Sequence, residues 1–117
     1  MEVSKPEISY EDFAKLDIRI GKIVAAELVP QTDKLIKCSV DFGDPPAGGG
    51  VRTIVSGIAE WKKPEELVVL SLPYVVNLAP RVLKGVESQG MLLAASDESG
   101  VVLLFPERAV APGTKLR

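Results

Sequence analysis

The chain is divided into short apolar runs of period two, which leave little room for helices. In LIKCSVDF (35–42) the residues at 36, 38, 40 and 42 are apolar and share one side of an extended strand. Runs of this kind predict strands at residues 18–25, 35–42, 51–57, 68–76, 91–96 and 101–105. A flavodoxin-like fold needs a helix after nearly every strand, and the spacing here excludes it. We therefore expect an all-β fold.

Two short helices fit around these runs. Ser9 precedes Tyr10-Glu11-Asp12-Phe13 in a capping-box arrangement, which predicts helical turns over 10–15. Pro64, followed by two glutamates, fits the first turn of a helix between the third and fourth strands. A five-stranded OB-fold, a Greek-key barrel, has a helix in that position. We predict one such domain over 1–117, with a short N-terminal helix, a C-terminal extension and a loose arm at 1–8.

Three local signals indicate irregular backbone. Gly21 interrupts the first strand and predicts a bulge there. Pro73 predicts that the fourth strand is either an edge strand or locally irregular. GDPPAGGG (43–50) predicts a flexible hairpin loop, because it lacks the spacing and the following helix of a phosphate-binding loop.

The composition excludes several classes of site. The chain contains no His, the commonest general base and metal ligand, and no residue constellation suggests an enzyme, a metal or a cofactor. Its single cysteine, Cys38, lies in an alternating strand, so we expect a buried structural thiol in a reducing compartment. No apolar run approaches the roughly 18 residues of a membrane span, and the N-terminus lacks the apolar core of a signal peptide. We expect a cytoplasmic protein without membrane contact.

A long polar stretch, residues 77–90, follows the fourth strand and exceeds the usual length of a connection. OB-folds bind ligands across strands 2–3, between the loops that join strands 1–2 and strands 4–5. Here those loops are residues 29–34 and 77–90. The fold would gather five basic residues on one surface: Lys34, Lys37, Arg52, Arg81 and Lys84. The formal net charge of -2 argues against indiscriminate nucleic-acid binding but is compatible with one local basic face.

Each candidate has an ordinary structural interpretation, which remains open. The basic residues of the strands fit a solvated surface, and Arg52 fits an ion pair with Asp41 across the hairpin. Asn77, at the end of an apolar strand, fits a side chain that ties its own loop through backbone hydrogen bonds. Met91 fits either a contact beneath a base or a filler at the mouth of the barrel.

The chain resembles the family of tRNA-binding OB domains in four segments: DIRIGKIVAAELVPQTDKLIKCSVDFG, RTIVSGIAEW, PEEL and NLAPRVLKGVESQGMLLAAS. The segments occur in matching order and extend the likeness over about residues 9–117. The pattern NLxPR…GxxSQGM is specific. The members that it most resembles are the stand-alone dimeric bacterial tRNA-binding protein and the C-terminal or β-subunit domain of methionyl-tRNA synthetase.

The resemblance implies a homodimer that recognises the shape of folded tRNA rather than an anticodon sequence. It would bring tRNA to an aminoacyl-tRNA synthetase, the methionyl enzyme, as an accessory protein. The positions that match the family's tRNA contacts are Lys34, Asn77, Arg81, Ser88 and Met91, with support from Lys37, Arg52 and Gln89. The family often carries a second basic residue directly after the position of Arg81, where this chain has Val82. Either Lys84 substitutes for it or the affinity is lower.

Two other functions stay open. A relative of the family is associated with chaperone activity, which implies a chaperone-like binder of unfolded export proteins as an alternative. A protein- or oligosaccharide-binding OB module is a third interpretation, and it rests on the fold alone.

Apolar residues near both ends of the chain exceed what a five-stranded barrel needs to fill its core. In a monomer they would form an exposed patch of the kind that marks an interface. A two-fold interface uses the same patch on both copies and therefore closes as a dimer. The predicted interface residues are Ile8, Phe13, Leu16, Phe105, Val110 and Leu116.

Overall fold

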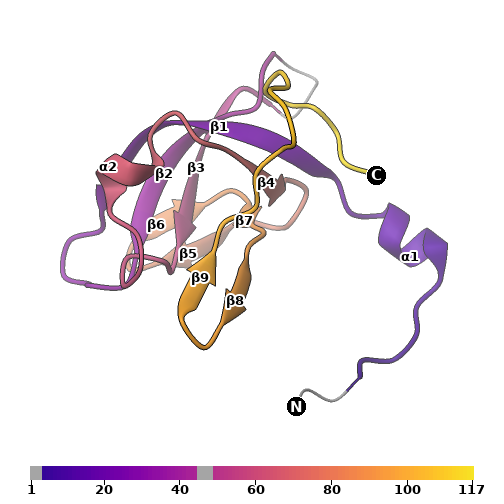
Figure 1. Cartoon of the computed structure of the whole chain (residues 1–117), viewed down its shortest axis with the longest axis horizontal. Coiled ribbons are helices and arrows are strands. Elements are labelled where there is room, and N and C mark those ends of the chain that lie inside the picture. Colours follow the sequence, from indigo (N-terminus) through magenta and orange to yellow (C-terminus); the bar gives the residue numbers. More distant parts are fainter. Residues whose placement is uncertain (1–3, 45–48) are drawn as a thin grey trace.

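The computed structural model describes residues 4–44 and 49–117, so residues 45–48 of the predicted loop lie outside it. The fold is all-β, built on one curled sheet of five antiparallel strands in the order β3–β2–β1–β4–β7 (Figure 1). These strands are β1 (Ile18–Leu28), β2 (Ile36–Asp41), β3 (Val51–Ser56), β4 (Ser71–Val75) and β7 (Met91–Leu92). The curled sheet and its strand order confirm the predicted OB-type barrel.

β1 links the two halves of the sheet, because it pairs with a different strand along each half of its length. Residues 22–28 pair with β2, and residues 18–22 pair with β4. On the free side of its first half β1 bonds the predicted C-terminal extension. There the N–H of Ile20 donates to the carbonyl of Thr114 at 2.8 Å, and the N–H of Gly113 donates to the carbonyl of Ile20 at 2.7 Å. The extension is therefore part of the barrel wall.

The predicted bulge at Gly21 lies further along β1. The register with β2 shifts between Ile23 and Ala25, whereas Gly21 pairs regularly with β4. Gly21 is needed for another reason, since a Cβ at this position would overlap the side chains of Val40 and Phe42. The glycine lets β1 pass directly over the core.

The alternation of β2 builds the core as predicted. Ile36, Cys38, Val40 and Phe42 are all buried, and the Phe42 ring meets Tyr74 edge-on with centroids 5.5 Å apart. Burial raises the pKa of the Cys38 thiol to about 11, so almost none of it ionises near neutral pH. Cys38 is a structural thiol, as predicted.

Helix α1 (Tyr10–Ala14) forms where it was predicted but leaves the body of the molecule. Its cap is half of a capping box: the N–H of Asp12 donates to Ser9 Oγ at 3.2 Å, while the Asp12 carboxylate pairs with Lys15 instead of reaching back. Residues 4–8 before it are exposed and have no regular structure. Figure 1 shows α1 and this arm outside the curled sheet.

Helix α2 (Pro64–Leu67) lies between β3 and β4, which confirms the OB-fold prediction. Pro64 occupies its first turn, and the Glu66 carboxylate accepts a hydrogen bond from the Lys63 N–H at 2.8 Å. Leu67 is fully buried and fixes the helix to the core. Four residues thus close this part of the barrel.

The stretch predicted as a long loop contains a β-hairpin of its own. β5 (Arg81–Leu83) pairs with β6 (Val86–Ser88), and the two-residue turn between them has positive φ at both Lys84 and Gly85. A two-residue turn with positive φ at both positions matches the twist of the flanking strands. The prediction of a loop was wrong here because the strands have only three residues each and their apolar pattern is short.

The last two predicted strands are also shorter than expected. Only Met91 and Leu92 of the run 91–96 join the main sheet, and the chain then turns away. β8 (Ala95–Asp97) and β9 (Gly100–Val102) form a separate hairpin. β4 lies between β1 and β7, so the predicted edge position of Pro73 is wrong, and its pairing with Ile20 of β1 is regular. The carbonyl of Pro73 accepts a hydrogen bond from the N–H of Leu93 at 3.0 Å, beyond the last residue pair of the β4–β7 ladder.

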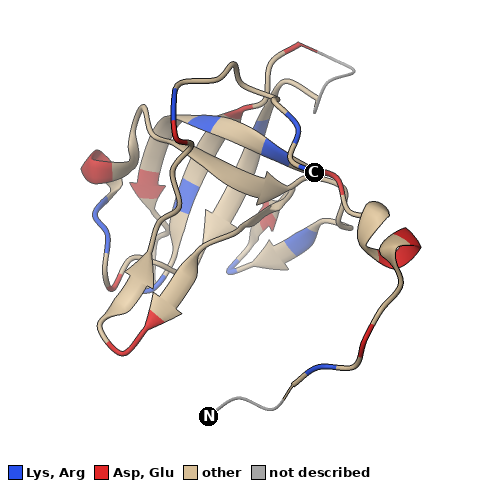
Figure 2. Cartoon of the chain, turned by 45° about the vertical axis from the view of Figure 1, so that its right-hand side comes forward, with Lys and Arg blue, Asp and Glu red and all other residues tan. Residues whose placement is uncertain are grey.

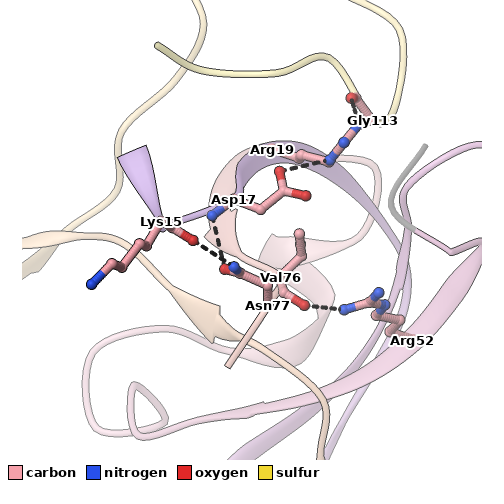
Figure 3. Close-up of polar contacts among 7 residues, drawn as sticks. All are labelled: Lys15, Asp17, Arg19, Arg52, Val76, Asn77 and Gly113. Carbon is pink, nitrogen blue, oxygen red and sulfur yellow. Dashed lines mark hydrogen bonds and ion pairs between the residues drawn. The ribbon is translucent and has the colours of Figure 1, made fainter. Parts of the chain in front are cut away.

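Asn77 connects the end of β4 to the link between α1 and β1 (Figure 3). Its Oδ1 accepts a hydrogen bond from the N–H of Asp17 at 2.8 Å, and its Nδ2 donates to the carbonyl of Lys15 at 2.7 Å. The side chain therefore ties a segment 60 residues away rather than its own loop. In the same region Arg19 donates to Asp17 and to the carbonyl of Gly113.

Replacing Asn77 by Ala should destabilise the protein, because both hydrogen bonds are lost at once. We expect a loss of about 1–2 kcal/mol in the free energy of unfolding, measured by urea denaturation. Asn77→Asp is the matched control: it keeps the acceptor for the Asp17 N–H, so its loss should be smaller. Wild-type stability of Asn77→Ala would contradict this structural role.

Candidate nucleic-acid interface

The β5–β6 hairpin is held against the edge of β3 by two side chains of the SQG segment. The N–H of Val55 donates to Ser88 Oγ at 2.9 Å, and the N–H of Thr53 donates to Gln89 Oε1 at 3.1 Å. The backbone of Gln89 returns a bond to the carbonyl of Thr53 at 2.8 Å. Ser88 is buried, and its hydroxyl also donates to the carbonyl of Gly90. Ser88 and Gln89 therefore position the hairpin.

Two cavities open between this hairpin and β3. The first, of about 310 Å³, extends toward Leu78 and Ser88. The second, of about 370 Å³, extends toward residues 56–58 and 94–96. Four residues line both cavities: Val55, Arg81, Leu83 and Met91. The shared lining is therefore apolar, with Arg81 as its one cationic residue.

The cations of the hairpin have no partner among the described residues. Arg81 and Lys84 are both exposed, and neither forms an ion pair within residues 4–44 and 49–117. Figure 2 shows Lys and Arg on this hairpin, whereas the tip of the β8–β9 hairpin, with Asp97 and Glu98, is acidic. The net charge of -2 is thus compatible with a local basic surface.

Two further predicted residues border the same face of the barrel. The carbonyl of Lys34 accepts a hydrogen bond from the N–H of Ala59 at 3.1 Å, next to the residues that end the second cavity. Lys37 is the cross-strand neighbour of Val55, so its side chain lies on the outer face with it. Lys37 differs from Lys34 in being paired, with its Nζ 2.9 Å from a carboxylate oxygen of Glu27.

Arg52, near the start of β3, lines neither cavity. It donates to the carbonyls of Val76 and Gln89, and its guanidinium lies over the Phe42 ring, 5.9 Å from the centroid. The expected pair with Asp41 does not form, since that carboxylate accepts a bond from Gly43 instead. Arg52 thus joins β3 to the end of β4, and a contact with tRNA remains a prediction for this residue, as it does for Asn77.

The structure thus brings Arg81, Ser88 and Met91 to one site, with Lys84 at the hairpin tip. Sequence reasoning missed Val55 and Leu83, which form the floor. In the sequence both look like ordinary strand or loop residues. Leu83 is placed on the face toward β3 only by the pairing of β5 with β6. The alternation within VRTIVSG was the one available signal for Val55.

The predicted dimer residues fall into two groups. On the N-terminal side, Ile8, Phe13 and Leu16 are exposed. On the C-terminal side, Phe105, Val110 and Leu116 line a cavity of about 340 Å³ beside Ile20 and Pro73. Both groups lie away from the β5–β6 hairpin in sequence and in their contacts.

The described residues contain no group of three His, Cys, Asp or Glu side chains that could hold a metal ion. Among the same residues no helix has the length and apolar character that crossing a membrane requires.

Comparison with known proteins matches the chain to a family model described as "Putative tRNA binding domain" over residues 18–115. Methionine–tRNA ligase of Pyrococcus furiosus is 48% identical over 94% of this chain and 14% of the ligase. Methionine–tRNA ligase of Methanoregula boonei is 50% identical over 96% of this chain and 16% of the ligase. The chain therefore spans about a seventh of the length of these relatives.

Among solved structures, a MetRS-related protein from Pyrococcus horikoshii is similar over 97% of this chain and 100% of its own, with a TM-score of 0.87 and 39% identity. The chaperone CsaA of Bacillus anthracis is similar over 96% of this chain and 100% of its own, with a TM-score of 0.83 and 31% identity. The family model covers most of the barrel, from the start of β1 to the segment that closes against it. This chain belongs to the family of tRNA-binding domains.

Proposed function

We propose that the protein binds folded tRNA and acts as a non-catalytic accessory of an aminoacyl-tRNA synthetase, the methionyl enzyme. The observation that carries the proposal is the β5–β6 hairpin, where Arg81 and Lys84 form no ion pair with any described residue and Arg81 lines an apolar cavity. The relatives named methionine–tRNA ligase support the link to that synthetase. The proposal includes a cytoplasmic location, where tRNA is aminoacylated.

The physical basis is phosphate binding by a surface that is already ordered. Ser88 and Gln89 fix the hairpin to β3 before any ligand arrives, so the backbone that carries Arg81 is already ordered and only its side chain loses conformational freedom on binding. A guanidinium presents a planar set of donors that matches a phosphate. Lys34, whose carbonyl bonds Ala59 next to the second cavity, would extend the basic surface.

A second candidate function is chaperone-like binding of unfolded polypeptide. The likeness to proteins described as the chaperone CsaA favours it, and the apolar floor of the two cavities could receive apolar side chains. Denatured polypeptide should compete with tRNA if this function uses the same surface. If denatured polypeptide does not displace bound tRNA, the first function is favoured.

Folded tRNA should bind more tightly than oligo-dT of similar length. The chain has three Phe, two Tyr and one Trp, and Phe42 and Tyr74 are buried in the core. The other four aromatic residues are exposed, but none of them lines the two cavities at the hairpin. General single-strand binding, in which each stacked base contributes about 1–3 kcal/mol, therefore has no stacking platform there. A gel-shift series over several salt concentrations measures both affinities, and equal affinity for the two nucleic acids would refute the preference.

Arg81→Ala and Lys34→Ala should each weaken tRNA binding and lower the slope of log affinity against log salt by about one unit, as for one lost phosphate contact. Arg108→Ala is the matched control, since it removes the same charge from the C-terminal segment and should leave both quantities unchanged. Met91→Ala should leave the slope unchanged, because it removes no charge. An unaltered slope in Arg81→Ala would mean that the hairpin is structural only.

We also propose that the working unit is a homodimer. Phe13 and Phe105 are 45% and 61% exposed, and the cavity beside Phe105 is lined by apolar side chains such as Val110 and Leu116. Exposed apolar surface of this extent at two places is expected to be covered by a second copy. Two copies would present the basic hairpin twice to one L-shaped RNA.

Light scattering should give about twice the 12.5 kDa chain mass without RNA. Phe105→Ser should shift the population toward monomer at micromolar concentration, because it removes apolar surface from the contact. Val82→Ser is the matched control: Val82 is 69% exposed but lies on the hairpin, so this variant should remain dimeric. A wild-type monomer that still binds tRNA tightly would overturn the dimer.

A further inference from the structure

The two cavities beneath the β5–β6 hairpin form one composite surface, here called the hairpin groove. They share Val55, Arg81, Leu83 and Met91, and each has a volume in the range of about 300–1,000 Å³ that is typical of small-ligand sites. The second cavity is also lined by the small residues Ala94, Ala95 and Ser96, together with Leu92 and Val101. Small and aliphatic side chains of this kind can pack against the face of a base.

The polar groups around the groove also limit what can bind there. Added peptide strands normally pair with free backbone groups at a sheet edge. The N–H groups of Thr53 and Val55 on the edge of β3 already donate to Gln89 and Ser88. A polypeptide therefore finds no backbone ladder at this edge, whereas Arg81 offers a cation to an anionic ligand.

We propose that the hairpin groove takes one unpaired nucleotide of the bound tRNA. The base would lie against Leu83 and Met91, and its phosphate would meet the Arg81 guanidinium. This inference rests on the proposed tRNA binding and adds to it a defined subsite. Bases in the loops of a folded RNA can be splayed out, while paired bases inside a helix cannot enter such a groove.

The side chains at the groove fit this ligand chemically. The Met91 thioether is flexible and polarisable, and sulfur makes favourable contacts with aromatic rings. Met91 is 45% exposed, so it is open to a ligand rather than sealed in the core. Arg81 alternates with Val82 along β5, which places Arg81 and Leu83 on the groove side of the hairpin together.

The test is an NMR titration of the full chain labelled at its two methionine methyl groups. Adenosine 5′-monophosphate should move the Met91 signal in a saturable manner through the ring current of the base. Ribose 5-phosphate and inorganic phosphate carry the anion without the base and should produce much smaller shifts. Equal shifts with all three compounds, or none, would overturn the subsite.

Addition of tRNA should move the Met91 signal in the same direction. If tRNA binds in the gel-shift assay but leaves this signal unmoved, the subsite is wrong and tRNA binding stands. If tRNA does not bind at all, the proposed function fails and the subsite fails with it. A shift produced by an apolar peptide, and not by the nucleotide, would assign the groove to polypeptide and overturn the proposal.

A blocking variant tests the groove by affinity. Ala95→Trp places a large ring at an exposed wall position and should weaken tRNA binding about tenfold, within the range for loss of one stacked base. The salt slope should stay at the wild-type value, because no charge is removed. Ser99→Trp adds the same ring at the β8–β9 turn, outside the groove, and should bind as wild type. Wild-type affinity of a folded Ala95→Trp would overturn the proposal.

Discussion

The close approach of β1 to the core at Gly21 is the constraint on which the rest of the fold depends. Val40 and Phe42 occupy the space that a Cβ at this position would need. With β1 seated on them, one strand can bond β2 along its second half and both β4 and the C-terminal segment along its first half. The sheet curls as a result, and Arg52 reaches from β3 to the carbonyl of Val76, just past β4. Two strands that are not neighbours in the sheet are thereby joined.

The same closure determines where the hairpin stands. Arg52 of β3 bonds the carbonyl of Val76, just past β4. Beyond that point the chain places the β5–β6 hairpin against the edge of β3 before it forms β7. The edge is filled by Ser88 and Gln89, whose side chains accept the two N–H groups that an edge strand would otherwise leave open. The residues of the SQG segment are therefore used mainly for positioning. Arg81 and Met91, which border them, are exposed and line the two cavities.

The sequence was sufficient for the all-β class, both helices and the first four strands, because each of these has a local signal. The alternation in β2, the Ser9 cap and the proline of α2 are of this kind. The β5–β6 hairpin was missed because three-residue strands carry too short a pattern, and their pairing is fixed by the edge of β3. The OB-fold interpretation placed Arg52 on the same surface as Arg81 and Lys84, and the resemblance added Asn77 as a tRNA contact. The hydrogen-bond partners of Asn77 and Arg52 lie at distant positions that no local pattern shows. Arg81 and Lys84 lie together because both belong to the β5–β6 hairpin.

The β5–β6 hairpin also shows the consequence of having Val82 at the position where the family often carries a second basic residue. Val82 pairs with Glu87 and lies on the opposite face from Arg81 and Leu83, so its side chain points away from the hairpin groove. A basic residue there would stand beside the Glu87 carboxylate and would reach only RNA that passes over the outer face. Lys84, at the tip of the turn with φ of 49°, is exposed and can reach past the end of either face. Under the proposed tRNA binding, contacts inside the groove would not depend on residue 82, and a cation there would act only on RNA that passes over the outer face.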